Sequence, residues 1–188
     1  PTKDSLLILT TVSPERIMAT VRSRCQMFRF PPLAANRVAQ LLQVQEGWDE
    51  ERSVFFSRFT DGSLSRAFKL AGEEFFSRKN EIIDNLVLAR NNEAYLKTVL
   101  SDKERTREAL EVLLSWFRDL LLMKAGAGHQ QIIHADRGPD VAKLASCYTF
   151  LQLEEIVTQT IETTRLLDEN LNVKIALTLL RDRICLRS

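Results

Sequence analysis

The residues best suited to chemistry are those of the tripeptide Ser23-Arg24-Cys25. An arginine side chain presents a planar, permanently charged fork of N–H donors that matches the oxygens of a phosphoryl group. Phosphoryl transfer spreads negative charge over those oxygens, so a guanidinium held beside them stabilises the transition state. The threonine pair Thr10-Thr11 precedes the tripeptide. These residue types suit phosphate chemistry at Arg24, and the alternative is a solvated arginine beside a small buried cysteine.

The remaining reactive side chains do not form a catalytic pattern. Glu73 and Glu74 are adjacent, and adjacent helix residues point about 100° apart, which favours solvated charge. His129 and His134 have no base or nucleophile at a suitable spacing, and three widely separated cysteines do not suit metal binding. We therefore expect no metal. The sequence has no glycine-rich phosphate loop, so we do not expect it to hydrolyse ATP by itself.

Composition narrows the class of protein. The chain has 188 residues, with 26 Lys and Arg against 25 Asp and Glu, and 45% of its residues are hydrophobic. A net charge of +1 argues against general polyanion binding. No apolar run approaches the roughly 18 to 20 residues of a membrane span, and the first residues do not resemble a signal peptide. These features predict a reduced, cytoplasmic protein without membrane partners.

Two short elements must position Arg24. Residues 6–9 are four consecutive apolar residues, which is typical of a strand buried on both faces. Ser13 is a suitable N-cap and Pro14 a suitable first residue for a short helix. Polar groups would then lie at the carboxyl end of a strand, where open α/β sheets bind ligands. A strand over 6–11 needs neighbouring strands. We therefore expect the C-terminal part of a longer protein, with this strand paired to another copy or loosely held.

Helical periodicity replaces the strand signal after Pro31-Pro32. Three short helices are expected up to about Gly72, with Asp49 and Ser63 as N-caps and Gly62 as a stop. Longer amphipathic patterns then predict a bundle of about five helices. The fold class is mainly α, with a remnant of an α/β domain over residues 1–30, a three-helix module over 31–72 and a helical bundle over 73–188.

The sequence resembles the clamp-loader family of AAA+ proteins in three places, in order along the whole chain. Residues 10–25, including Ser13-Pro14-Glu15-Arg16, are similar to the sensor-1 strand and arginine-finger motif. Residues 58–67 are similar to the Gly-Ser turn and sensor-2 helix of the lid domain. Residues 116–121, 132–136 and 170–177 are similar to the collar domain. Under this resemblance, 1–30 is the end of the AAA+ domain, 31–72 the lid and 73–188 the collar.

One departure indicates the type of subunit. In ATP-binding bacterial subunits of this family, the sensor-2 arginine lies three residues after the glycine of the Gly-Ser turn. Here that position is Ser65, and Arg66 follows one residue later. The resemblance therefore favours the non-hydrolysing delta-prime type of the bacterial DNA polymerase III clamp loader.

The resemblance also implies roles and partners. Arg24 would reach ATP bound by a neighbouring subunit, Ser23 and Cys25 would complete its motif, and Cys25 would serve packing. Thr11 and Arg66 would be sensor-like, with Thr11 a structural remnant. Arg22 is the local competitor of Arg24, about 200° away if the helix continues. The implied partners are gamma/tau ATPase subunits and a delta subunit, and indirectly the sliding clamp and primed DNA.

Two other interpretations stay open. The chain could belong to an ATP-hydrolysing gamma/tau-type subunit, for which Ser65 is unfavourable. It could also be an unrelated helical interaction module that binds nucleic acid. Such a module needs a clustered basic face, whereas acids and bases alternate here, as in residues 102–105.

Overall fold

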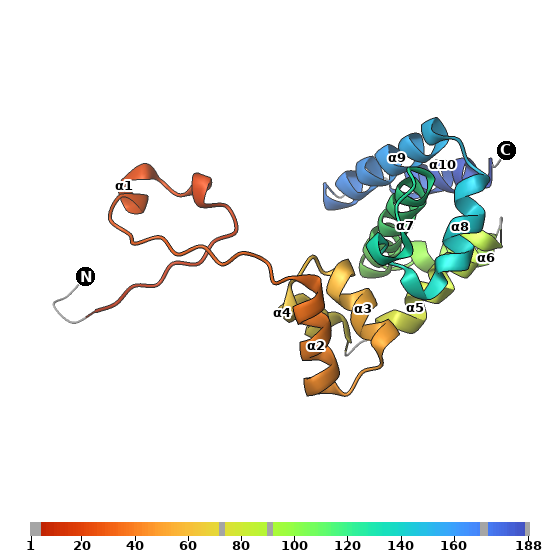
Figure 1. The fold of residues 1–188 in the computed structure, drawn as a ribbon. Helices are drawn as coiled ribbons and strands as arrows, with labels where there is room; N and C mark the ends of the chain where they lie inside the picture. Colours follow the sequence, from red (N-terminus) through yellow and green to blue (C-terminus); the bar gives the residue numbers. More distant parts are fainter. Residues whose placement is uncertain (1–4, 72–73, 90–91, 170–172, 187–188) are drawn as a thin grey trace. The chain divides into compact units, whose positions relative to one another are not determined.

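A computed structural model describes residues 5–71, 74–89, 92–169 and 173–186 of the chain. The chain divides into two units, Pro1–Pro31 and Pro32–Ser188. Helices form the regular structure, and the described residues contain no strand (Figure 1). The prediction of a mainly α chain is confirmed.

The N-terminal unit differs from its prediction. It contains one 3-10 turn, Pro14–Arg16, and the single-turn helix α1, Ala19–Arg22, and the Ser13 side chain makes no capping hydrogen bond. The strand predicted over residues 6–11 is wrong for this structure, because the described residues supply no neighbouring strand for its backbone. Its side chains are open to solvent, with Leu6 86% and Ile8 75% exposed. These exposures agree with a loosely held segment.

The second unit begins with three short helices whose ends follow from their sequence. These helices are α2, Ala35–Glu46, α3, Glu50–Phe59, and α4, Leu64–Ala71. The Asp49 carboxylate caps α3 by accepting the Arg52 N–H at 2.8 Å. Ser63 Oγ accepts the Arg66 N–H at 3.4 Å at the start of α4. The predicted caps and the stop at Gly62, which has φ +77°, are confirmed.

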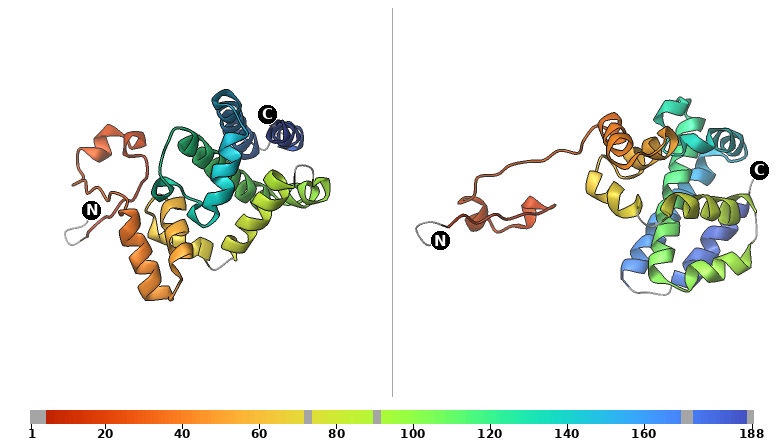
Figure 2. Two further views of the ribbon diagram at one scale, coloured as in Figure 1. Left: turned by 45° about the vertical axis from the view of Figure 1, so that its right-hand side comes forward. Right: turned by 90° about the horizontal axis from the view of Figure 1, so that it is seen from below.

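The rest of the second unit surrounds one long helix, α7, Lys103–Lys124 (Figure 2). Six α-helices are described where about five were predicted, because α6 and α8 are short. Helices α5, α6, α8 and α9 all pack against α7, and α10 packs against α9. The elements after α4 are α5 (Phe75–Ile82), the π-helical η2 (Ile83–Leu88), α6 (Glu93–Leu100), α7, the 3-10 turns η3 (His129–Gln131) and η4 (Ala135–Arg137), α8 (Gly138–Ser146), α9 (Phe150–Asp168) and α10 (Val173–Cys185).

The core of the second unit is continuous across residue 72, where the sequence predicts a boundary between lid and collar. Val38 and Phe55 on one side belong to the same buried cluster as Leu113 and Trp116 on the other. The Phe55 ring also lies 5.4 Å from the His134 ring, centroid to centroid. The segments predicted as lid and collar therefore stabilise each other by burying common apolar surface.

Gly62→Ala is expected to lower the free energy of unfolding by about 2–4 kcal/mol, from left-handed strain plus a steric clash. A Cβ at Gly62 would lie 2.1 Å from the Leu33 carbonyl oxygen. Gly47→Ala is the matched control, because Gly47 also has positive φ, at +66°, but no atom lies within 4 Å of its added Cβ. The control is expected to lose only about 1 kcal/mol, from left-handed strain alone. Urea denaturation of both variants tests this, and equal losses would contradict it.

Candidate functional site

Arg24 lies in the turn that ends α1. The Ser23 N–H donates to the Ala19 carbonyl at 2.9 Å, and the Arg24 N–H donates to the Val21 carbonyl at 3.1 Å. The side chains of Ser23, Arg24 and Cys25 are all exposed. Cys25 was predicted to be packed, so its exposure is a difference from the prediction. The Arg24 guanidinium makes no ion pair with the residues that the structure describes, so it is available to a ligand or partner.

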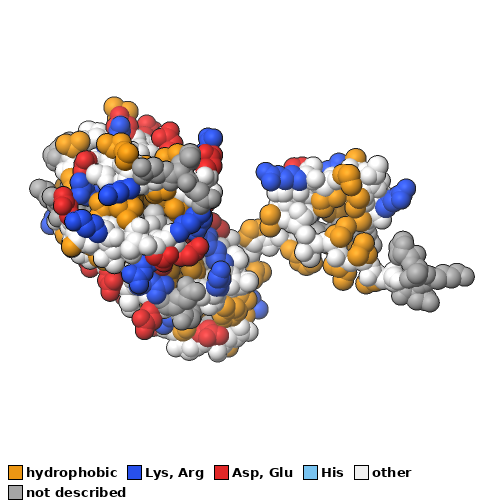
Figure 3. Space-filling view, turned by 180° about the vertical axis from the view of Figure 1, so that it is seen from behind, with side chains coloured by type: hydrophobic (Ala, Val, Ile, Leu, Met, Phe, Trp, Pro, Cys, Tyr) orange, Lys and Arg blue, Asp and Glu red, His pale blue; other side chains and the backbone are white. Residues whose placement is uncertain are grey.

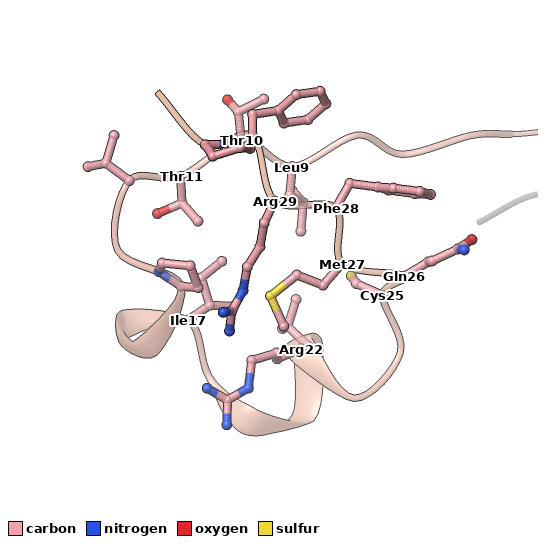
Figure 4. A pocket seen from close by; sticks show the side chains of 15 residues that line it. Leu9, Thr10, Thr11, Ile17, Arg22, Cys25, Gln26, Met27, Phe28 and Arg29 are labelled. Carbon is pink, nitrogen blue, oxygen red and sulfur yellow. The ribbon is translucent and has the colours of Figure 1, made fainter. Parts of the chain in front are cut away.

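A pocket of about 650 Å³ lies in the same unit, between α1 and the segments before and after it (Figure 4). Arg22 and Thr11 line this pocket, whereas Arg24 does not. Figure 4 shows apolar side chains such as Ile17 and Met27 around it. The structure therefore separates the two arginines that compete for a phosphate role.

Thr11 and Arg66, which the resemblance predicts to be sensor-like, both have structural contacts. Thr11 Oγ1 accepts the Ser13 N–H at 3.0 Å, which closes the turn before Pro14–Arg16. In the second unit, Arg66 forms an ion pair with Glu111 at 2.7 Å, and its guanidinium lies 5.5 Å from the centre of the Phe59 ring. Arg66 thereby connects α4 to α7. These contacts fix both side chains within the fold.

The sequence signal for the collar leads to a buried polar cluster. His134 is 0% exposed, its backbone N–H donates to Asp119 Oδ2 at 2.8 Å, and its Nε2 lies 2.9 Å from Ser115 Oγ. The Trp116 ring packs against the His134 ring, with centroids 5.2 Å apart. Residues 170–172 of the same signal, and Glu73, lie outside the described residues.

An ion pair between Lys79 and Asp136 adjoins His134. The Lys79 side chain is 0% exposed and that of Asp136 is 7% exposed. The Lys79 ammonium also lies over two aromatic rings, 4.6 Å from the centre of Phe55 and 4.2 Å from that of Phe76. Burial lowers the pKa of Lys79, and Asp136 opposes that shift. We call Lys79, Ser115, Asp119, His134 and Asp136 the junction cluster, because it connects α5, α7 and the segment around η4.

Burial suits the junction cluster to structure rather than catalysis. Burial, followed by the charges of Lys79 and Arg137, lowers the pKa of His134 well below its ordinary value. The imidazole is therefore neutral. The burial of Lys79 was not predicted from the sequence. Lys79 lies in a polar run, residues 77–81, and such a run is typical of a solvated helix face.

Two general findings bear on the class of site. Among the described residues, no group of three or more His, Cys, Asp and Glu side chains is placed to hold a metal ion. None of the described helices combines the length and apolar character that crossing a membrane requires.

Asp119→Asn is expected to change the pH dependence of stability. Burial raises the pKa of Asp119 from 3.8 to about 6, although backbone N–H groups of His134 and Ile133, then Arg118 and Arg58, oppose the shift. The folded state then binds more protons than the unfolded state between these values, so the ionised carboxylate destabilises the fold as pH rises. Between pH 7 and pH 4, wild type should gain up to about 3 kcal/mol relative to the variant.

Urea denaturation of both proteins at pH 7 and pH 4 measures this difference. His134 is present in both, so its opposite effect cancels in the comparison. Parallel pH profiles for the two proteins would contradict the predicted role of Asp119.

Comparison with known proteins identifies the family. A relative described as "DNA polymerase III subunit delta'" from Bacillus subtilis (strain 168) is 23% identical over 183 residues, covering 93% of this chain and 55% of the relative. The chain thus spans about half the length of that curated relative. The model of the family described as "DNA polymerase III, delta subunit, C terminal" matches residues 73–181. That range includes the junction cluster and the collar signal, so the predicted resemblance to the C-terminal part of a clamp-loader delta-prime subunit is confirmed. This chain belongs to the family formed by the C-terminal region of DNA polymerase III delta subunits.

Proposed function

We propose that this chain acts as a non-hydrolysing, delta-prime-type subunit of a sliding-clamp loader in DNA replication. The observation that carries this proposal is the family match over residues 73–181. The similarity to a DNA polymerase III subunit delta' covers more of the chain, 93% of it, and supports the same assignment. Its partners in this proposal are gamma/tau ATPase subunits and a delta subunit, and through them the sliding clamp and primed DNA. The protein acts in the cytoplasm.

In this proposal, Arg24 completes the ATP site of a neighbouring subunit, and this chain itself binds no ATP. Three features support that role: the exposure of the side chain, its freedom from ion pairs with the described residues, and its place in a hydrogen-bonded turn. The alternative is a hydrolysing gamma/tau-type subunit, in which the sensor arginine must reach the nucleotide. The ion pair of Arg66 with Glu111 is unfavourable for that alternative, because it holds the guanidinium against α7.

Collar contacts would come from α10, which is apolar on two sides. Leu177, Leu180 and Ile184 are buried, with exposures of 1% or less. Ile175 and Leu179, one turn apart, lie outside that buried stripe and are 62% and 53% exposed. An exposed apolar stripe on a helix is suited to contact with another subunit.

Direct binding of nucleic acid by a basic face has less support. On the face shown in Figure 3, Lys and Arg side chains of the second unit alternate with Asp and Glu side chains. Within the second unit, several basic side chains form ion pairs with acidic ones, such as Arg183 with Glu155 at 2.7 Å. The positive charge is therefore compensated locally rather than gathered for a phosphate backbone.

Assembly of the full-length protein with gamma/tau and delta subunits tests the proposal. Size-exclusion chromatography with light scattering should show one complex that contains this protein. The sliding clamp and primed DNA should stimulate ATP hydrolysis by that complex. Leu179→Glu should weaken assembly at least about tenfold, since it puts a charge into an apolar contact. Lys174→Glu is the control for added negative charge on exposed α10. Failure of the wild-type protein to join a complex would overturn the proposal.

A further inference from the structure

A second pocket, of about 250 Å³, lies within the second unit at the junction of α3 and α7. Residues from four separate parts of the chain line it: Leu33 and Ala35; Ser57, Arg58, Asp61 and Gly62; Arg118; and Gln131 and Ile133. Its charged lining residues are Arg58, Asp61 and Arg118. The lining is therefore positive by one charge, and the pocket is small enough to favour a small ion over a nucleotide.

The Arg58 guanidinium is held by one hydrogen bond and keeps several N–H donors without a protein acceptor. Its Nη1 donates to the Ile132 carbonyl at 2.5 Å, which fixes the guanidinium against the segment before η4. Burial lowers the pKa of Arg58, with a smaller opposing effect from Asp119, and no described carboxylate lies within ion-pair distance of it. A guanidinium carries five N–H donors, so one carbonyl leaves most of them without a protein acceptor.

Arg118 approaches the pocket from α7. Its Nη1 lies 3.2 Å from Asp119 Oδ1, and its side chain is 51% exposed. Asp119 is fully buried and uses its other oxygen to accept the His134 N–H. The Asp119 carboxylate thus accepts from one guanidinium group, that of Arg118, and from the backbone N–H of His134. Each of the two arginines keeps N–H donors without a protein acceptor, and the oxygens of an anion could accept from them.

We propose that this pocket binds a tetrahedral oxyanion, such as a sulfate or phosphate ion or a terminal phosphate group, between Arg58 and Arg118. Charge-assisted hydrogen bonds from guanidinium to such oxygens are short and strong, and two arginines can contact one ion. The bound ion would connect α3 to α7 and so stabilise the fold. This site is independent of the clamp-loader role, so each proposal can fail alone.

Isothermal titration calorimetry with sulfate and the full chain tests the site. The ionic strength is kept constant by replacing chloride with sulfate. Wild type should show saturable binding, and Arg118→Gln should weaken it at least about tenfold, since one charged contact is lost. Arg183→Gln removes an exposed arginine outside the pocket and should leave the affinity unchanged.

Two further measurements complete the test. Arg58→Gln should also weaken binding, but it removes the donor to Ile132, so half-exposed Arg118 provides the variant that should stay folded. A comparison of glycerol phosphate with free phosphate shows whether a phosphate group attached to a larger molecule fits the pocket. Equal affinity would mean that the pocket accepts terminal phosphate groups. Binding of the free ions alone would mean that it is a site for small ions. Absence of saturable sulfate binding, or equal binding by wild type and Arg118→Gln, would overturn the proposal.

Discussion

Replacing Arg24 with alanine is expected to slow ATP hydrolysis at the neighbouring subunit's site by about 10³- to 10⁵-fold in a reconstituted clamp-loader complex. The guanidinium would stabilise charge on the transferring phosphoryl group, and alanine leaves that charge without its donor. Arg24 is exposed and does not line the pocket of its own unit, so the substitution should not disturb folding. Single-turnover hydrolysis by complexes of confirmed size measures the effect.

Two variants sharpen the Arg24 result. Arg24→Lys keeps the charge but loses the planar fork, so it should also be strongly impaired. Arg22→Ala should hydrolyse ATP normally, because Arg22 lines the pocket beside α1 instead. An assembled Arg24→Ala complex with an unchanged rate would show that the tripeptide has no role in hydrolysis. Loss of activity in Arg22→Ala alone would transfer the role to that residue.

Lys79→Met is expected to lower the free energy of unfolding by about 3–5 kcal/mol, because it leaves a buried carboxylate without its cation. Lys79 and Asp136 have side-chain exposures of 0% and 7%. Methionine keeps much of the aliphatic length of lysine, so the loss comes from charge more than from volume. Chemical denaturation of the full chain measures it.

The matched control is Lys143→Met, because Lys143 is an exposed lysine on α8. Its effect should stay within about 0.5 kcal/mol. The double variant Lys79→Met/Asp136→Leu should recover much of the lost stability, since replacing both members of a buried pair by apolar groups removes the unpaired charge. Equal stability of Lys79→Met and Lys143→Met would show that the ion pair contributes nothing.

Several features encoded by neighbouring residues were predicted from the sequence, although the predicted Ser13 cap was wrong. The Asp49 cap, the stop at Gly62 and the start of α4 at Ser63 depend on contacts within a few residues, and the structure shows each of them. The apolar faces of α7 and α10 follow from helical spacing in the same way. Local chemistry thus explains most of the second unit.

Features encoded by distant residues could not be predicted. The strand over 6–11 needs partner strands that the described residues do not contain. Lys79 is polar among polar neighbours, and only its packing under Phe55 and Phe76 and against Asp136 accounts for its burial. Arg66 has a role in the fold only because Glu111, 45 positions away, lies beside it. The arginine pocket likewise joins four parts of the chain.

The open N-terminal segment has a consequence for the behaviour of the protein in solution. Residues 6–12, Leu-Leu-Ile-Leu-Thr-Thr-Val, carry no charge, proline or glycine, and Leu6 and Val12 at its two ends are 86% and 101% exposed. Uncharged segments of high β propensity and this length stack readily into cross-β fibrils when they are uncovered. Whatever covers these residues therefore protects the protein from amyloid-like aggregation.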